Sequence, residues 1–343
     1  MNQTIPSAPP DHPSVKHGRI GVLLTNLGTP DGYTYRPMRR YLSEFLSDKR
    51  VIDYPAWKWQ PILQLIILSK RPFTSGANYR SIWNSEKNES PLLTISREQC
   101  EKLRRSLGGS VSVEFGMRYG NPSSADRLKQ MQADGCDRIL HFPLYPQYSA
   151  STTGSANDAV FRAMLELKWQ PALRTVPPYF DHPTYIGALA RSLKSGLERL
   201  DFDPDAIVAS YHGLPQRYLL EGDPYYCHCR KTSRLLTGEL GWTEERLITT
   251  FQSRFGSEEW LQPYTVEKVA ELARSGRRRI AVAAPGFAAD NIETLEEIQG
   301  EIREAFESAG GDRFAYIPCL NASDDHIGMI AEIVMQNLAG WTG

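Results

Sequence analysis

The sequence has few cysteines and lacks long apolar runs, and both features limit the classes of protein to which it can belong. Its five cysteines among 343 residues are odd in number and scattered, which is typical of free thiols in a reducing compartment. No stretch reaches the ~18 apolar residues of a membrane-spanning helix. The first fifteen residues are polar and proline-rich, so no secretory signal is visible. We therefore expect a cytoplasmic protein.

An excess of one charge is also lacking. Lys and Arg number 39 and Asp and Glu number 40, which gives a net charge of −1. Since nucleic-acid-binding proteins normally carry a basic excess, we expect no nucleic-acid partner. The sequence contains no G-x-G-x-x-G after a strand, no phosphate-binding G-x-x-x-x-G-K-[ST], no G-x-S-x-G and no H-E-x-x-H. Nucleotide-dependent, serine-hydrolase and zinc-protease chemistry therefore lose their main support.

The sequence does contain short apolar runs that alternate with amphipathic stretches, such as residues 96–107 and 124–134, which predict helices. The runs in the first half are 19–27, 112–119 and 138–142, and those in the second half are 206–211, 246–252 and 278–284. Most are followed closely by Gly or Pro, which is typical of buried parallel strands. The alternation predicts an α/β fold with parallel sheets flanked by helices, in two similar α/β domains.

The restart of this pattern predicts how the chain is divided. We expect a disordered tail over residues 1–17, an N-terminal domain over 18–165 and a C-terminal domain over 166–323, followed by a last helix. Ligands of open α/β sheets bind beyond the carboxyl ends of the strands. The unusual residues fall at those ends, so we expect the site in a cleft between the two domains.

One histidine stands at the end of a predicted strand. His212 follows the run 206–211 and precedes Gly213-Leu214-Pro215, a tight turn that would direct the ring into the cleft. A histidine there can accept a proton or bind a metal. A histidine that merely packs at a strand end is the alternative, and for a lone histidine it is the commoner case.

Four acidic residues follow the last predicted strand of the second half. Asp290, Glu293, Glu297 and Glu301 are spaced by three, four and four residues, which places them on one helical face. A solvated acidic face is the usual interpretation, but most of this line lacks Lys or Arg partners one turn further on. Packed carboxylates can bind a hard cation or pass protons. A spacing of four exceeds the ordinary turn, so a local π-type widening would align these residues better.

The segment of residues 54–71 is tryptophan-rich and apolar almost all round, yet too short to span a bilayer. A buried core helix is one interpretation. The sharper one is an apolar lip that covers a flat ligand or dips into a membrane surface, with Lys70 and Arg71 at its end. The lip predicts peripheral contact with the inner face of a membrane.

Taken together, the motifs make the sequence resemble the ferrochelatase family, enzymes that insert ferrous iron into a porphyrin to make heme. The matching blocks follow the family's order along nearly the whole chain. They are LTNLGTP at 24–30, MRYGNP at 117–122, YPQYS at 145–149 with STTG at 151–154, SYHGLP at 210–215 with GDPY at 222–225, and WLQP at 260–263 with PGFAADNIETLEEI at 285–298.

The resemblance implies two Rossmann-like domains related by a pseudo-twofold, with a C-terminal helix at about 324–343 that packs back on the first domain. It implies a lyase that releases two pyrrole protons as iron enters protoporphyrin IX. It implies His212 and Glu293 as the essential pair at the metallation centre, as catalytic groups and as metal ligands. A bent porphyrin would expose its nitrogen lone pairs, His212 would accept a proton, and Asp290, Glu297 and Glu301 would help Glu293 to carry protons away or guide the cation. The implied porphyrin contacts are Leu27, Arg71, Tyr79, Ser90, Arg118, Tyr119, Trp260 and Phe287. Whether His212 or the opposite pair, Arg118 and Tyr119, first holds the iron stays open.

The resemblance implies ferrous iron as a substrate and no prosthetic group. Some members hold a [2Fe–2S] cluster, which needs four ligands, normally thiolates. Here Ala150 follows the YPQYS block and no cysteine follows Cys319, so we expect no iron–sulfur cluster. The Cys227-His228-Cys229 cluster has no assigned role. Leu27 and Asn291 differ from residues in parts of the family and flank the expected porphyrin site.

Two alternatives remain open at this point. One is a related chelatase that inserts cobalt or acts on coproporphyrin, although the apolar lip favours the less polar protoporphyrin. The other is a porphyrin or heme carrier without catalysis, which would need neither His212 as a base nor the acidic line.

Overall fold

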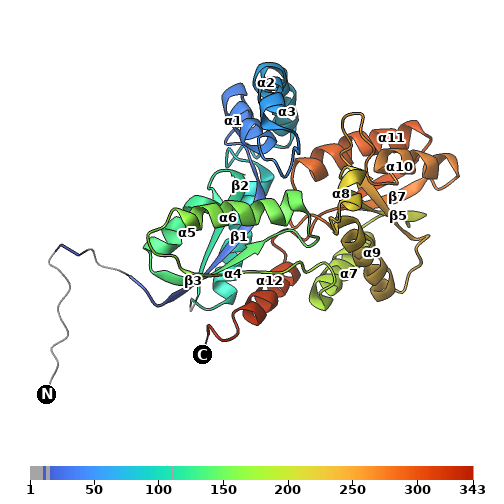
Figure 1. The fold of residues 1–343 in the computed structure, drawn as a ribbon. Helices are drawn as coiled ribbons and strands as arrows, with labels where there is room; N and C mark the ends of the chain where they lie inside the picture. Colours follow the sequence, from blue (N-terminus) through green and yellow to red (C-terminus); the bar gives the residue numbers. More distant parts are fainter. Residues whose placement is uncertain (1–10, 13–15, 110, 343) are drawn as a thin grey trace.

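Two parallel sheets form the framework of the computed structural model, which describes residues 11–12, 16–109 and 111–342 (Figure 1). The first sheet has the order β2-β1-β3-β4 and the second β6-β5-β7-β8, so both units repeat one topology. The strands are β1 (Arg19–Thr29), β2 (Ser112–Gly120), β3 (Cys136–Pro143), β4 (Ala172–Thr175), β5 (Ala206–His212), β6 (Leu247–Gln252), β7 (Arg279–Ala283) and β8 (Arg313–Ile317). The predicted fold class is confirmed. Most of the predicted tail, residues 1–10 and 13–15, lies outside the described residues.

The sequence pattern predicts six of these strands and misses β4 and β8. Both are outermost strands of their sheets, and most of their residues are only half-buried. A strand of this kind has no continuous apolar run, which is the signal that identified the other six.

Helices cover both sheets and connect successive strands. They are α1 (Tyr35–Leu46), α2 (Ala56–Ile62), α3 (Leu68–Ile82), α4 (Pro91–Ser106), α5 (Ser124–Ala133), α6 (Ser155–Leu165), α7 (Pro183–Glu198), α8 (Gln216–Leu220), α9 (Tyr225–Leu240), α10 (Thr265–Arg274), α11 (Arg303–Ser308) and α12 (Asp324–Asn337). Three segments are π-helical: η1 (Leu63–Ile67), η2 (Ala150–Gly154) and η3 (Glu293–Ile302). The part of the chain described here has no helix that is both long and apolar enough to cross a bilayer.

Helix α4 begins five residues earlier than the amphipathic pattern predicts. Ser90 accepts a hydrogen bond from the Leu93 N–H, and Pro91 occupies the first helical position. This Ser-Pro pair is a start signal that satisfies one free N–H and removes another. The prediction of 96–107 is therefore wrong at its N-terminal end.

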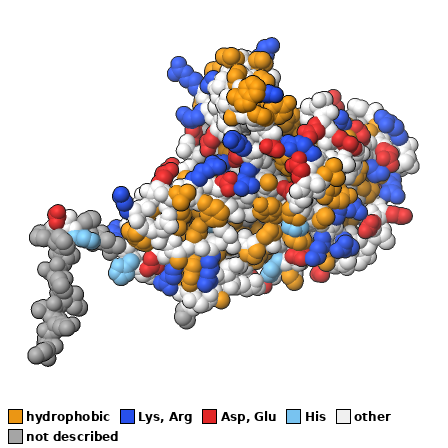
Figure 2. Space-filling view, in the orientation of Figure 1, with side chains coloured by type: hydrophobic (Ala, Val, Ile, Leu, Met, Phe, Trp, Pro, Cys, Tyr) orange, Lys and Arg blue, Asp and Glu red, His pale blue; other side chains and the backbone are white. Residues whose placement is uncertain are grey.

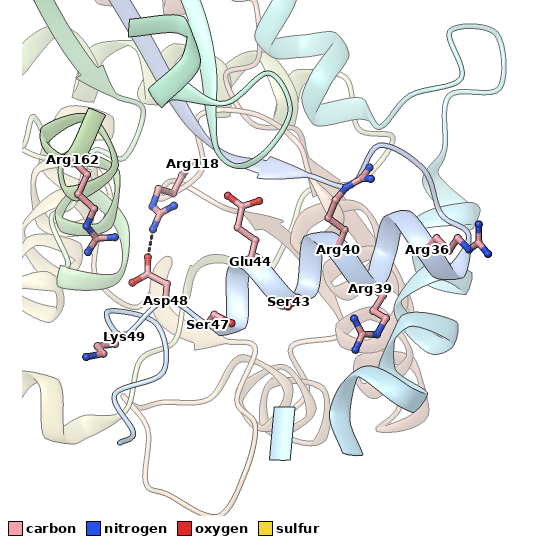
Figure 3. A pocket seen from close by; sticks show the side chains of 10 residues that line it. All are labelled: Arg36, Arg39, Arg40, Ser43, Glu44, Ser47, Asp48, Lys49, Arg118 and Arg162. Carbon is pink, nitrogen blue, oxygen red and sulfur yellow. Dashed lines mark hydrogen bonds and ion pairs between the residues drawn. The ribbon is translucent and has the colours of Figure 1, made fainter. Parts of the chain in front are cut away.

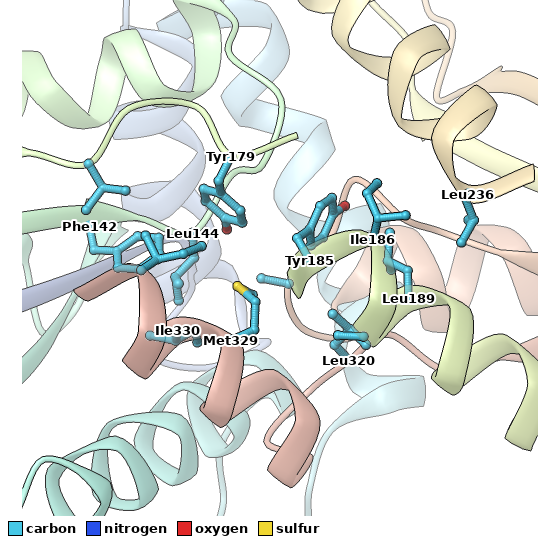
Figure 4. Close-up of a cluster of buried hydrophobic side chains, with 14 of the residues drawn as sticks. Phe142, Leu144, Tyr179, Tyr185, Ile186, Leu189, Leu236, Leu320, Met329 and Ile330 are labelled. Carbon is cyan, nitrogen blue, oxygen red and sulfur yellow. The ribbon is translucent and has the colours of Figure 1, made fainter. Parts of the chain in front are cut away.

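The largest hydrophobic cluster joins the two units. It combines side chains from β1, β2 and β3 with others from β5, α7, α9 and α12. In Figure 4, Phe142 and Leu144 of the first unit face Tyr185 and Ile186 of α7, and Met329 of α12 lies between the groups. Helix α12 thus packs against α4 and α7 at the junction of the units, so that both sheets share one core.

The lip of residues 54–71 belongs to a helical projection above the first sheet (Figure 1). Leu63 and Leu68 are fully buried, whereas Trp57, Leu65 and Ile66 are 75%, 74% and 62% exposed. Figure 2 shows hydrophobic side chains at the tip of this projection, with basic side chains beside them. The core-helix interpretation is therefore wrong for most of the segment, which is an exposed apolar surface, whereas its contact with a flat ligand or a membrane stays a prediction.

Candidate active site

His212 lies at the carboxyl end of β5, where the predicted turn follows it. Its Nδ1 lies 2.6 Å from the Gly213 carbonyl oxygen. A carbonyl can only accept a hydrogen bond, so Nδ1 carries a proton, and in the neutral ring the lone pair lies on Nε2. A Cβ atom at Gly213 would lie 2.6 Å from the Gln252 carbonyl oxygen and 3.0 Å from the Trp260 ring. The turn therefore requires glycine, and it orients the half-buried imidazole so that Nε2, not Nδ1, is the nitrogen available to a ligand or a proton.

Gln252 links the strand that carries His212 to the backbone of Glu293. Gln252 ends β6 and pairs with His212 in the parallel register of the sheet. Its Nε2 donates to the Glu293 carbonyl oxygen at 2.9 Å and to Glu297 Oε2 at 3.2 Å. The sequence reasoning assigned no role to Gln252, although its position at the end of a strand next to β5 is the same signal that identified His212.

The Glu293 carboxylate is held in an unfavourable environment for charge. Its Oε2 is buried and has no hydrogen-bond partner among the described residues. Burial, together with the nearby carboxylates of Glu297 and Glu296, raises the pKa of Glu293 to about 7. A carboxyl that titrates near neutrality can both take and release a proton, which is typical of a functional site.

The line of glutamates follows the predicted π-type widening. Glu293, Glu297 and Glu301 all lie in η3, and the wider turn accommodates their spacing of four. Glu297 accepts hydrogen bonds from the Ser253 N–H and the Ser253 hydroxyl, both at 2.6 Å. Burial and the Glu297 charge raise the pKa of Glu301. The predicted π-type widening is confirmed, and the charge interactions of Glu297 with Glu293 and with Glu301 agree with neighbouring carboxylates along it.

Asp290 does not belong to that line. It precedes η3, and its carboxylate accepts hydrogen bonds from the Tyr316 hydroxyl at 2.5 Å, the Asn321 amide at 2.6 Å and the Thr294 hydroxyl at 3.0 Å. The bonds from Tyr316 and Asn321 hold the Asp290 side chain toward β8 and the loop after it, and the bond from Thr294 ties it to the start of η3. The expectation of four carboxylates on one face is wrong for Asp290.

Asn291 also acts at the start of η3. Its side-chain oxygen accepts from the Thr294 N–H at 3.1 Å, while its own N–H donates to the Thr294 hydroxyl at 3.0 Å. This reciprocal pair is a capping arrangement that satisfies free backbone groups. The buried Asn291 therefore has a local structural role in addition to its place beside the site.

Tyrosines of the first unit face Glu293 from the other side. Burial and the Glu293 charge raise the pKa of Tyr79, and the same charge adds to the effect of burial on Tyr41 and Tyr145. Leu27, at the end of β1, packs in the same cluster as Tyr79 and Ile292. Residues at or just after the ends of β1, β3 and β6 therefore lie around one acidic residue. The sequence reasoning quoted Tyr145 only as part of a motif and missed Tyr41.

Arg118 and Tyr119 form a closed network with Asp48. Arg118 donates to Asp48 Oδ2 at 2.5 Å and to the Ser155 hydroxyl at 2.6 Å, and the Tyr119 hydroxyl donates to the same carboxylate oxygen at 2.8 Å. The Arg118 and Asp48 side chains are 11% and 6% exposed. Although burial raises the pKa of Asp48, hydrogen bonds from Ser155, the Arg50 N–H and Tyr119 bring it below its ordinary value.

A basic groove of about 920 Å³ opens beside this network, on the outer face of α1 (Figure 3). Six basic and two acidic side chains line it, together with Ser43 and Ser47. The charged residues are Arg36, Arg39, Arg40, Glu44, Asp48, Lys49, Arg118 and Arg162. Neither His212 nor Glu293 lines this groove, so it is separate from the site at the ends of the strands.

The remaining predicted porphyrin contacts, Arg71, Trp260, Phe287 and Ser90, differ in how exposed they are. Arg71 is exposed on α3, and its guanidinium lies 6.0 Å from the ring of Phe255 in the second unit. Trp260 is buried, at 5.1 Å from Phe255 in an edge-to-face arrangement. Phe287 is half-buried in the loop before η3. The Ser90 hydroxyl is 2% exposed and caps α4, so the structure turns it toward its own helix.

No ready-made metal site is present in the described part of the chain, where no three His, Cys, Asp or Glu side chains lie together as ligands. The Cys227-His228-Cys229 cluster is likewise spread out: Cys227 is exposed and Cys229 is buried. The ring of His228 stacks on Phe180 at 3.7 Å, and its Nδ1 accepts the Tyr148 N–H at 3.2 Å. The cluster therefore helps to join the units.

Comparison with known proteins identifies close relatives along the whole chain. The family model for ferrochelatase matches residues 19–338. A ferrochelatase of Rhodobacter capsulatus is 62% identical over 345 residues, covering 99% of this chain and 98% of that protein. A ferrochelatase of Rhizobium etli is 54% identical over 343 residues, covering 99% of this chain and 100% of that protein.

Solved structures with a similar fold are much more distant in sequence. SirB from Bacillus subtilis with Fe3+ aligns with a TM-score of 0.56 at 10% identity, over 94% of this chain and 97% of that one. The sirohydrochlorin chelatase SirB in complex with cobalt aligns with a TM-score of 0.54 at 9% identity, over 93% and 95%. At this identity the likeness shows the shared two-unit fold alone.

Proposed function

This chain belongs to the ferrochelatase family, which inserts ferrous iron into protoporphyrin to form heme, and we propose that His212 and Glu293 are the two residues that perform the insertion. The observation that carries this proposal is the hydrogen bond between His212 Nδ1 and the Gly213 carbonyl oxygen. Because Nδ1 is bonded to the Gly213 carbonyl, Nε2 is free to accept a pyrrole proton as iron enters. Ferrous iron and the porphyrin are the substrates.

Glu293 would accept and pass on a proton during insertion. Its pKa of about 7 lets it accept a proton at neutral pH and release it again. Glu297 and Glu301 continue from it along η3, so a proton or a hydrated cation can pass from one carboxylate to the next. Asp290 supports this line from its start, through its bond to Thr294.

Arg118 and Tyr119 lie across from this pair, in the first unit. Their polar groups are already bound to Asp48 and Ser155, which makes them a rigid boundary of the porphyrin site. Insertion of iron from the His212 side is therefore the better supported route. Leu27, Tyr79, Trp260, Phe287 and the lip would supply apolar walls, and exposed Arg71 would meet a propionate.

Two further properties belong to the same proposal. The exposed lip, with Lys58, Lys70 and Arg71 beside it, supports contact of an otherwise cytoplasmic protein with a membrane surface. The cysteines support an enzyme without an iron–sulfur cluster, because Cys100, Cys136 and Cys229 are buried in different elements. A nucleic-acid partner is not expected, and the division of the chain near residue 165 stays a prediction.

The test is the replacement of His212. We expect His212→Ala to lose insertion of ferrous iron into protoporphyrin by ~10²–10⁴-fold, the usual cost of a missing general base, while porphyrin binding persists. His182→Ala is the matched control, because His182 lies at the start of α7, bonded to Gln336 on the surface. Near-normal turnover of His212→Ala under anaerobic assay would refute the assignment. A porphyrin carrier would bind porphyrin and show no insertion in the unmodified protein.

A further inference from the structure

The loop that leads from β7 to Glu293 is held by residues from outside it. The Tyr185 hydroxyl of α7 donates to the Pro285 carbonyl oxygen at 2.5 Å. Gln99 Nε2, from α4 of the first unit, donates to the Ala288 carbonyl oxygen at 3.1 Å. Both side chains are buried. The first half of the loop is therefore fixed by the core that joins the two units.

The second half of the loop is held mainly through Asp290, which Asn321 binds twice. The Asp290 N–H donates to Asn321 Oδ1 at 2.8 Å, and Asn321 Nδ2 donates to Asp290 Oδ2 at 2.6 Å. The oxygen and the nitrogen of the Asn321 side-chain amide thus both bind Asp290, one at its backbone N–H and the other at its carboxylate. The other carboxylate oxygen accepts from the Tyr316 hydroxyl at 2.5 Å. We call this arrangement the Asn321 clasp.

Asn321 is itself fixed in an uncommon conformation. Its φ is +50°, in the left-handed region that asparagine tolerates better than most residues. Its carbonyl oxygen accepts hydrogen bonds from Gln99 Nε2 at 2.9 Å and from His326 Nδ1 of α12 at 2.5 Å. Gln99 therefore bonds both the loop and the residue that holds it. The clasp connects the loop, the first unit and the C-terminal helix.

The hydrogen bonds around Asp290 matter because Glu293 Oε2 has no hydrogen bond among the described residues to hold it in place. Glu293 lies three residues after Asp290. Its place is therefore set by the backbone at the start of η3, which Asp290 holds through Thr294. We propose that Asn321 is a positioning residue, which keeps Glu293 in place for metal insertion by clasping Asp290. This inference rests on the proposed role of Glu293 in the reaction.

Asn321→Gly tests the clasp with little disturbance elsewhere. Glycine adopts the left-handed conformation without strain and keeps the carbonyl that Gln99 and His326 bind. Only the two hydrogen bonds between the Asn321 side-chain amide and Asp290 are therefore lost. We expect kcat to fall by about 10- to 100-fold, as a small misplacement of a reacting group can cause, while the KM for porphyrin stays within about twofold. The matched control is Asn337→Ala, at the C-terminal end of α12. It removes one side-chain hydrogen bond, from Asn337 Nδ2 to the Ile333 carbonyl oxygen, and should leave kcat and KM unchanged.

A double mutant separates positioning from simple loss of stability. If Asn321 acts through Glu293, then Asn321→Gly should slow the residual turnover of Glu293→Gln by less than about twofold, because the displaced group is already missing. If the losses multiply, or if Asn321→Gly alone keeps normal kcat, the positioning role is wrong. If Glu293→Gln itself keeps normal kcat, the proposed role of Glu293 fails first and the inference falls with it.

Tyr316→Phe provides the second variant, should Asn321→Gly not fold. It removes only the hydroxyl that donates to Asp290 Oδ1 and leaves the backbone of the loop unchanged. We expect a smaller fall in kcat with an unchanged KM, and again no further fall on the Glu293→Gln background. An unchanged kcat in Tyr316→Phe, with the protein folded and loaded with porphyrin, would count against the clasp as the device that positions Glu293.

Discussion

Replacing Glu293 by glutamine should inactivate the enzyme and make it more stable at the same time. The pKa of this carboxyl is about 7 in the folded protein against an ordinary 4.5, so the fold prefers its neutral form. Below pH ~4.5 the group is protonated in both states and has no effect on stability. As the pH rises from ~4.5 toward 7, Glu293 loses its proton in the unfolded chain but keeps it in the folded protein, so the free energy of unfolding falls. Above pH ~7 the group is ionised in both states and the loss stays constant.

The size of this effect follows from the same shift. At ~1.4 kcal/mol for each tenfold change in the proton equilibrium, the shift corresponds to about 3 kcal/mol. The side chain is half-buried, so we expect about 2–3 kcal/mol above neutral pH. Glutamine has similar shape and carries no charge, and Glu293→Gln should escape this cost. Metal insertion should fall by ~10²–10⁴-fold, and Glu301→Gln should be milder, since Glu301 lies two turns further out.

Urea unfolding at about pH 5 and about pH 8 provides the measurement. Glu293→Gln should exceed the wild type in unfolding free energy near pH 8, with a much smaller difference near pH 5. Glu304→Gln is the matched control, because Glu304 lies exposed just after η3 and should behave as wild type at both values. Equal stability of Glu293→Gln and wild type near pH 8 would refute the argument that Glu293 is held in an environment hostile to charge.

Three more predictions concern other parts of the molecule. Asp48→Asn should lower the unfolding free energy by about 3 kcal/mol, because it leaves the buried Arg118 guanidinium without its counter-ion; a loss under about 1 kcal/mol in urea unfolding would contradict this. Replacing exposed Leu65 and Ile66 by Ser should weaken sedimentation with anionic liposomes or raise the KM for protoporphyrin, whereas Leu165→Ser, equally exposed on α6, should change neither. The purified protein should contain no acid-labile sulfide; about two sulfides per chain would reveal a [2Fe–2S] cluster.

The sequence predicted most of the fold because the signals that it used are local. Six buried strands carry apolar runs, and the spacing of Glu293, Glu297 and Glu301 predicted the widened helix that the structure contains. What it missed depends on contacts between distant residues. Nothing in the residues near Asp290 indicates that Asn321 and Tyr316, about thirty residues later, bind its carboxylate.

The same limit applies to the first unit. Arg118 and Tyr119 were predicted to face the porphyrin, yet their polar groups bind Asp48, seventy residues earlier in the chain. Gln252 could have been found, since it ends the strand next to His212, but its bonds to Glu293 and Glu297 depend on where η3 lies. Strand ends therefore predict where a site is, and only the packed structure determines which side chains remain free in it.

The location of the chemistry in one unit has a physical explanation in the repeated fold. After β3 and after β7 the chain enters a π-helix, and each begins with a reciprocal cap: Ser149 with Thr152 in η2, and Asn291 with Thr294 in η3. The backbone device is thus the same in both units. In η2 the turn carries only small neutral residues, whereas η3 carries the glutamates. Both helices start beyond the carboxyl ends of parallel strands, where such sheets bind ligands. On the proposed assignment, the glutamates of η3 therefore give the second unit its groups for proton transfer, and neutral η2 leaves the first unit to provide a wall.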